Sequence, residues 1–393
     1  MKKATFKLKE TAQQIALVNA MGSKNTQVSM DAQQALAAFL GPVIQKVLST
    51  KGTAAAIYKD APYDEDDSPS YPLDLYYGEL DGYVTVWSQQ MAGGLPTSQV
   101  TGNQEMKFMT YSLDSAVSFN KRYARKSRLD IVSAAIERMI NEVLITQEKE
   151  AWNVITKAVA EATTTPKNGS ALKHVLRANT ADSFVINDLN DLMTRHDRLN
   201  ESYSGNTPTD VFSNGPTDLY VSPEIVGQIR AFAFNPLNTK AGVLSGTDSA
   251  GYADSSVPLP ESMREEIFRN AGMQNIYGVN IVKLIEFGVG KKYNELFDTF
   301  AGSTTYAELD GTNSAVFAGA SEEILVAIDN TRGAFIRPVA RGGHDMTSET
   351  GATFQVLPDD QFNLSRVDKA GFWGHLEEGR VCLDGRAVSG IIV

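Results

Sequence analysis

Histidine and cysteine are the side chains of this chain best suited to metal binding or nucleophilic catalysis, and their spacing argues against both. The four histidines, His174, His196, His344 and His375, stand far apart in the sequence. A helical pair of metal-binding histidines needs a spacing of about four residues. Cys382 is the single cysteine, so this chain can form neither an internal disulfide nor a cysteine-rich zinc site. We therefore expect the histidines to be surface or polar-network residues.

The other motifs that could do chemistry are incomplete. No serine lies in the Gly-x-Ser-x-Gly pattern of a hydrolase nucleophile. Residues 288–292 approach a phosphate-binding loop, but Lys292 stands where that loop needs Ser or Thr. The acidic run 64–67 lacks the ligand alternation and the glycine of a calcium loop. We predict no catalytic residue, no metal and no cofactor, and keep a hydrolase whose site is assembled from scattered residues as the alternative from another class.

Charge and hydropathy limit the partners that this chain can bind. The 393 residues are 42% hydrophobic and 21% charged, which is ordinary for a globular protein and enough for two packed domains. The net charge of −11 disfavours gripping DNA or an anionic membrane, because both need lysine and arginine to neutralise phosphate. No apolar stretch is long enough to span a membrane, and no apolar core follows the basic start. We expect a protein made and used in a cytoplasm, or in something assembled there.

The elements that would position any site begin with two helices in an N-terminal arm. Residues 10–20 are expected to form the first, and Asp31 is a plausible N-cap of the second. Apolar residues at helical spacing from Leu36 to Leu48 form one stripe, which Gly41 and Pro42 should break into two short helices or kink. The stripe must pack on later parts of the chain or on another copy.

A long hairpin is expected next, over residues 71–119. Residues 83–88 alternate as in a strand, a loop with Gly93 and Gly94 follows, and residues 106–111 form a second strand-like run. Because a lone hairpin is only marginally stable in water, this one should need a partner surface.

The strongest periodic pattern predicts one long helix. Residues 127–162 contain neither Gly nor Pro and carry apolar residues at helical spacing, which gives a rod of about 50 Å. Residues 180–320 read as a mixed α/β unit, with a strand at 218–221 that runs into a helix capped by Ser222 and Pro223, another strand at 278–282 and a long loop at 240–262. Strands should return at 324–328, 335–336 and 353–357, and as a pair within 372–393 that turns at Asp384 and Gly385.

This order of parts resembles the Hong Kong 97-type capsid fold of tailed bacteriophages, an α+β fold. Local runs that are similar to the family's elements support the resemblance, namely residues 128–132, 219–230, 277–282, 369–374 and 378–388. The resemblance covers roughly residues 75–393. It implies an N-terminal arm (1–75), an extended hairpin loop (76–119), a peripheral domain with the spine helix (120–180), an axial domain (181–322) and a return to the peripheral domain (323–393).

The resemblance also implies a function without catalysis. Such a major capsid protein self-assembles as pentamers and hexamers into an icosahedral shell in the host bacterial cytoplasm. The shell encloses double-stranded DNA without reading its sequence, in the company of scaffolding, portal and cement proteins, and no membrane is involved. An encapsulin-like nanocompartment shell protein is the closest rival.

The candidate functional residues are therefore expected at contacts between subunits. They are Leu36, Phe39, Trp87, Phe108, Arg122 and Arg125. The two arginines belong to a basic run at the start of the long helix, whose alternatives are a solvated surface, a contact with carboxylates of an adjacent subunit such as the acidic run 64–67, and a contact with packaged DNA.

Overall fold

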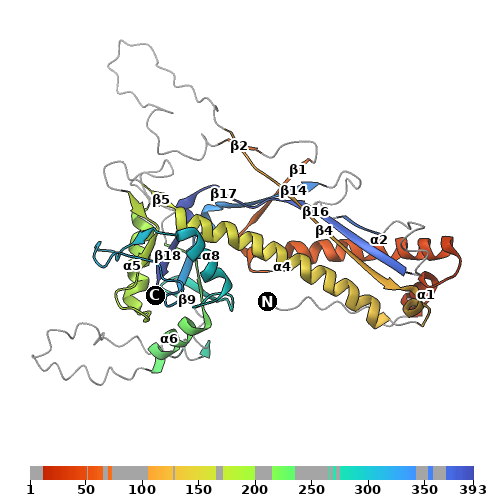
Figure 1. The fold of residues 1–393 in the computed structure, drawn as a ribbon, viewed down its shortest axis with the longest axis horizontal. Coiled ribbons are helices and arrows are strands. Elements are labelled where there is room, and N and C mark those ends of the chain that lie inside the picture. The colour runs from red at the N-terminus through yellow and green to blue at the C-terminus, as the bar shows by residue number, and fades with distance from the viewer. Residues whose placement is uncertain are drawn as a thin grey trace, which may run out of the picture. The chain divides into compact units, whose positions relative to one another are not determined.

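Two units make up the chain, and each is built from separate segments. The computed structural model describes residues 12–50, 52–64, 70–72, 105–126, 129–164, 171–199, 215–234, 265, 269–270, 275–341, 353–356 and 369–393. Unit 1 takes Met1–Tyr77, Gly82–Trp152 and Phe335–Leu383, and unit 2 takes Gly78–Asp81, Asn153–Ala334 and Asp384–Val393. Helices and strands both contribute throughout (Figure 1), which confirms the expected α+β class.

Unit 1 is organised around a mixed sheet in which β16 (Lys369–Glu378) is central. It pairs with β4 (Tyr111–Asn120) along its full length, and also with β15 (Thr353–Val356) and β14 (Phe335–Arg341). β14 in turn pairs with β1 (Lys59–Asp64) and β17 (Val381–Cys382). Side chains of β4 alternate between half-buried and exposed, as expected of a sheet with one covered face.

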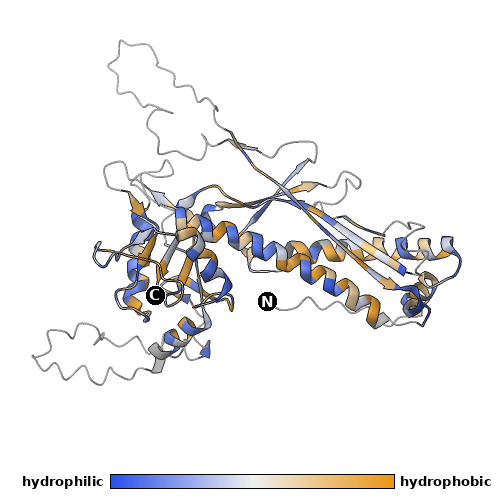
Figure 2. Ribbon diagram, in the orientation of Figure 1, coloured by the Kyte–Doolittle hydropathy of each residue, from blue (hydrophilic) through white to orange (hydrophobic). Residues whose placement is uncertain are grey.

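Helices cover that inner face. They are α1 (Ala12–Met21), α2 (Thr26–Thr50), α3 (Lys121–Arg125) and α4 (Leu129–Glu161), with the short 3-10 helix η1 (Ala54–Ala56) after α2. α4 has 33 residues and confirms the predicted long helix; its first part belongs to unit 1 and its last turns to unit 2. Leu36 and Leu40 of α2, Ile136 of α4 and Phe372 of β16 are fully buried in one core. Figure 2 shows apolar residues along these helices.

Two expectations for the N-terminal segment need correction. The side chain of Asn25, not Asp31, caps α2, because its Oδ1 accepts a hydrogen bond from the backbone N–H of Gln27 at 3.1 Å. The predicted division into two short helices at Gly41 and Pro42 is wrong, since α2 is one element from Thr26 to Thr50. A proline inside a helix costs about 3 kcal/mol, but Leu40 and Ile44 on either side of it are buried and offset that cost.

Unit 2 contains a second sheet, in the order β7-β18-β13-β8-β10-β9. Its strands are β7 (Val175–Arg177), β18 (Val388–Ile392), β13 (Ile324–Ile328), β8 (Asp218–Val221), β10 (Val279–Lys283) and β9 (Asn275–Ile276). Among the described residues of unit 2, three longer helices accompany them, α5 (Ile186–Arg198), α6 (Pro223–Phe234) and α8 (Lys292–Ala301). The shorter elements are β5 (Thr163–Thr164), β6 (Leu172–Lys173), β11 (Thr305–Tyr306), β12 (Ala315–Val316), η5 (Asn330–Arg332) and η6 (Gly385–Ala387). The predicted cap is confirmed, because Ser222 Oγ accepts from the N–H of Ile225 at 3.2 Å.

The strand pairings differ from those expected in two places. The predicted strand pair within 372–393 is wrong, because β16 lies in the sheet of unit 1 and β18 in the sheet of unit 2. Asp384 caps η6 between them. In the expected hairpin, residues 83–88 and the Gly93–Gly94 loop lie outside the described residues, as does the loop 240–262. The second strand of the expected hairpin is divided into two elements. β3 (Glu105–Lys107) pairs with β2 (Ser70–Pro72), and β4 pairs with β16. No described helix is both long and apolar enough to cross a membrane.

Candidate functional site

A serine, a histidine and an aspartate meet inside unit 2. His196 Nδ1 lies 3.2 Å from Ser389 Oγ, and His196 Nε2 lies 4.0 Å from Asp329 Oδ2. These are the residue types of a hydrolase triad. Sequence reasoning missed the cluster because its three residues are far apart in the chain. They meet only when β13, which Asp329 follows, pairs with β18 and α5 packs against β18.

The cluster is closed to substrates. His196 and Asp329 are each 1% exposed, and Ser389 is 0% exposed. Burial alone would raise the pKa of Asp329, but the nearby His196 ring and hydrogen bonds from the backbone N–H and hydroxyl group of Thr331 hold it below its usual range. Because nucleophilic catalysis needs the serine oxygen within reach of a substrate, this arrangement acts as an internal polar network that joins α5 to the strands of unit 2.

His174 has a similar structural role, which fixes its tautomer. Its Nδ1 lies 2.9 Å from the carbonyl oxygen of Val388, and its Nε2 lies 2.8 Å from Thr164 Oγ1. A carbonyl oxygen only accepts, so Nδ1 carries the proton and Nε2 accepts from the hydroxyl group. Burial lowers the pKa of His174 to about 4, so the ring is neutral near pH 7.

Unit 2 should therefore lose stability in mild acid. The unfolded chain protonates His174 below a pKa of about 6.5, whereas the folded chain does so only near its pKa of about 4. Between these values the unfolded state binds more protons. The free energy of unfolding should therefore decrease as the pH is lowered, by up to about 1.4 kcal/mol per pH unit. Hydrogen exchange of β13 and β18 amides, corrected for the intrinsic pH effect, measures it.

The variant His174→Gln should flatten this dependence, and His375→Gln, at a half-exposed histidine of unit 1, should leave it unchanged. Equal pH dependence of β18 protection in all three proteins would show that His174 is not the group responsible.

A buried ion network occupies unit 1. Glu378 is 0% exposed and its Oε2 accepts from Arg337 Nε at 2.7 Å and from Gln147 Nε2 at 3.0 Å. Its Oε1 accepts from Tyr111 at 3.1 Å and from Arg380 Nη2 at 3.3 Å. Burial by itself would raise the pKa of Glu378, but the charges of Arg337 and Arg380 outweigh it and keep that pKa below its usual range.

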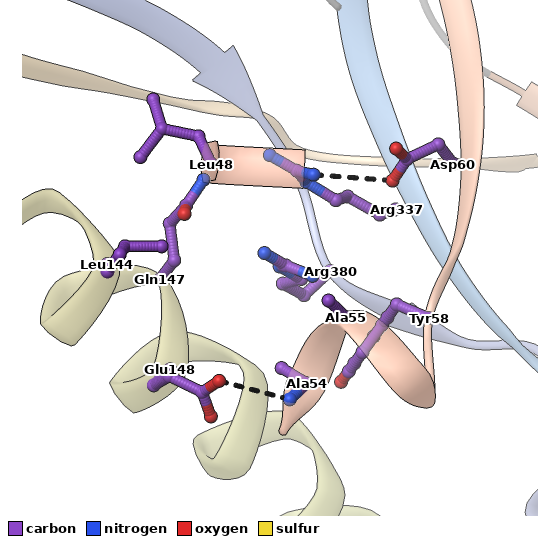
Figure 3. A pocket seen from close by; sticks show the side chains of 10 residues that line it. All are labelled: Leu48, Ala54, Ala55, Tyr58, Asp60, Leu144, Gln147, Glu148, Arg337 and Arg380. Atoms are coloured by element: carbon purple, nitrogen blue, oxygen red, sulfur yellow. Dashed lines mark hydrogen bonds and ion pairs between the residues drawn. The ribbon is translucent and has the colours of Figure 1, made fainter. Parts of the chain in front are cut away.

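A hollow next to this network is too small for a substrate. Figure 3 shows Arg380 between Arg337 and Tyr58, with Glu148 turned towards Ala54. Glu148 accepts from Ala54 N at 3.1 Å and from Thr53 Oγ1 at 2.8 Å. The space available to centres of water-sized spheres is about 10 Å³, roughly that of one water. No three of the described His, Cys, Asp or Glu residues are placed to hold a metal ion.

An apolar stripe lies on the outer face of α2. Phe39 is 59% exposed, Val28 is 42% exposed and Val43 is 41% exposed. At about 100° per residue, these three positions fall within one narrow sector of the helix. Leu36, one turn before Phe39 and about 60° around the helix from it, is 1% exposed and belongs to the core of unit 1. The apolar sector of α2 is therefore wider than the part that its own unit covers, and one edge of it stays exposed.

The remaining candidates fall into three groups. Phe108 is 8% exposed and packs with Ile336 and Leu383 inside unit 1, while the next residue, Met109, is 92% exposed. Trp87 lies outside the described residues, and so does most of the acidic run 64–67. Arg122 and Arg125 are both on α3, with exposed side chains. Among the described candidates, the two arginines thus share α3, as Leu36 and Phe39 share α2.

Comparison with known proteins yields matches among solved structures alone, since no protein-family model and no curated protein matches the sequence. Solved phage structures are similar over most of their length. Microbacterium phage Oxtober96 has 11% identity and a TM-score of 0.46, with 87% of this chain and 90% of that chain covered. The asymmetric unit of the bacteriophage PhiM1 mature capsid has 10% identity and a TM-score of 0.45, with 87% and 86% covered.

An encapsulin complex gives a similar result. The holo-SrpI encapsulin complex from Synechococcus elongatus has 10% identity and a TM-score of 0.40, with 85% of this chain and 84% of that chain covered. Similarity at this level does not decide a function, which depends on the surfaces of the chain itself.

Proposed function

We propose that this chain is the major capsid protein of a tailed bacteriophage with the Hong Kong 97-type fold. Its copies assemble as pentamers and hexamers into an icosahedral shell around double-stranded DNA. The observation that carries the proposal is the outer stripe of α2, where Phe39, Val28 and Val43 are exposed beside the buried face of the helix. Exposed apolar patches on an otherwise packed surface mark protein interfaces.

The order of elements supports this fold. Two N-terminal helices precede a strand region, the long α4 and the second sheet, after which the chain returns to the sheet of unit 1 through β14, β15 and β16. In the proposal, residues 1–75 are the arm, 76–119 the extended loop, 120–180 and 323–393 the peripheral domain, and 181–322 the axial domain.

The proposal is structural and not enzymatic, and the closed state of the Ser389 cluster supports it. The shell would be assembled in the host bacterial cytoplasm and become part of the virion. Scaffolding, portal and cement proteins are its expected partners, and the DNA is enclosed without sequence-specific contacts.

Electron microscopy of the purified protein tests the proposal. Closed icosahedral shells, or isolated pentamers and hexamers, are the expected result, and a small oligomer with hydrolase turnover would contradict it. Shells that carry a protein cargo and never DNA when isolated from cells would favour the encapsulin-like alternative.

Phe39→Asp should prevent shell formation while leaving the subunit folded. The new carboxylate would have to be buried without a partner at the interface, whereas in the isolated subunit Phe39 is 59% exposed. The matched control is Gln34→Asp, which adds the same charge at an exposed position of α2 outside the stripe. Normal particles from Phe39→Asp would show that the stripe is not an interface; circular dichroism verifies the fold of both variants.

A further inference from the structure

Positively charged side chains gather at one end of unit 1. α1 and α3 pack against each other there, and Arg125 Nε donates to the carbonyl oxygen of Gly22 at 2.6 Å. β4 ends and the antiparallel β16 begins at the same place, where Lys369 is in register with Asn120, the residue before α3. The exposed cations at this end are Lys24, Arg122, Arg125, Lys126 and Lys369.

Most of these cations have no partner within the described part of the chain. Lys24, Arg122, Lys126 and Lys369 form no ion pair with a described residue. Elsewhere in the same unit, Arg337 and Arg380 are both paired with Glu378. Among the described residues this end is therefore a cluster of unpaired positive charge, which we call the basic end.

The two units differ in charge. Unit 1 is close to neutral, so unit 2 carries nearly the whole net charge of −11. Copies of such a chain repel one another through unit 2 unless a basic surface is placed against it.

Unit 2 has a concave surface that suits such a partner. A hollow of about 420 Å³ is lined by Asp182, Glu308 and Glu322, and among its described lining residues Arg177 alone is basic. Arg177 is already paired with Glu322. Asp191 is next to this hollow, since Asn179, a lining residue, donates to it at 2.9 Å. We call this surface the acidic hollow.

We propose that the basic end of one copy binds the acidic hollow on unit 2 of a neighbouring copy, and that this contact orients subunits in the shell. The inference rests on the proposed function for the assembly in which the contact occurs. It assigns the partner of the basic end to a second copy of this chain and not to DNA. The charge asymmetry favours a copy, because DNA would leave the negative charge of unit 2 uncompensated.

The test reverses two charges at the basic end of the full-length chain. The double variant Arg122→Glu and Lys126→Glu should assemble at least tenfold less than the parent at about 0.15 M salt. The matched control is Arg138→Glu, at an exposed arginine in the interior of α4, which should assemble like the parent.

A charge swap identifies the partner surface. Ala181 is exposed and lines the acidic hollow, so Ala181→Lys places a positive charge there without removing a hydrogen bond of its own side chain. Added to the double variant, Ala181→Lys should restore most of the lost assembly, and alone it should weaken assembly of the parent. Failure of Ala181→Lys to restore assembly would overturn the assignment of the hollow.

Two outcomes would overturn the contact itself. One is normal assembly of the double variant. The other is normal shells with reduced DNA retention, which would assign the basic end to DNA. If the parent forms no shells, the proposed function fails separately, and sedimentation of parent and double variant at low and high salt still tests whether copies associate through these charges.

Discussion

Glu378→Gln should lower the free energy of unfolding of unit 1 by about 3–5 kcal/mol, the range for breaking a buried ion pair by removing one partner. Glutamine keeps the size and one carbonyl acceptor, but it leaves Arg380 a buried cation that has lost its carboxylate partner, and Arg337 with Asp60 alone, at 3.3 Å. In the native protein both arginines form ion pairs with the Glu378 carboxylate. Arg337 Nη2 lies 2.6 Å from Oε2, and Arg380 Nη2 lies 3.3 Å from Oε1.

Tryptophan fluorescence during urea unfolding measures this effect in unit 1. All three tryptophans, Trp87, Trp152 and Trp373, belong to unit 1 segments, so unit 2 does not contribute to the signal. The control is Glu377→Gln, whose carboxylate accepts only from hydroxyl groups, those of Tyr63 and Thr110. If both variants unfold at the same urea concentration, the two arginines are solvated well enough without Glu378 and the argument fails.

Leu40→Ala should cost about 2–5 kcal/mol of the stability of unit 1, because it leaves a cavity in a packed core. Leu40 is 0% exposed and belongs to the cluster formed by α1, α2, α4 and the sheet. The same fluorescence experiment applies.

The adjacent residue provides the control. Phe39→Ala removes a larger side chain that is 59% exposed, so its effect on the isolated subunit should stay within about 0.5 kcal/mol, although shell formation should suffer. A large loss of stability in Phe39→Ala would mean that the outer stripe is covered within the subunit. Similar small losses in both variants would mean that α2 does not contribute to the core.

Local periodicity was sufficient to predict the elements that have it. α4 and α1 were expected at nearly their observed bounds, and β13, β8 and β10 within a residue or so. Helical spacing also placed Leu36, Leu40 and Ile44 on one stripe of α2. What periodicity does not contain is the partner of each strand, so β16 and β18 were expected to pair with each other although they belong to different sheets.

The candidate surface was predictable only in part, for a similar reason. Leu36 and Phe39 are three residues apart and both apolar, and composition alone does not say that one is buried and the other exposed. The charges of Arg122 and Arg125 were visible in the sequence, but the approach of Lys24 and Lys369 depends on α1 packing against α3 and on the register of β4 with β16. The Ser389 cluster had no local signature at all.

The position of β18 has a consequence for synthesis on the ribosome. β18 lies between β7 and β13, so the sheet of unit 2 has no continuous hydrogen bonding between these two strands until residues 388–392 have emerged. β16, equally late in the chain, joins β4 to β14 in unit 1. Domains ordinarily fold from the N-terminus as they are made, but here both sheets wait for the same stretch of about two dozen residues. A nascent chain therefore cannot complete either sheet before these last residues have emerged from the ribosome.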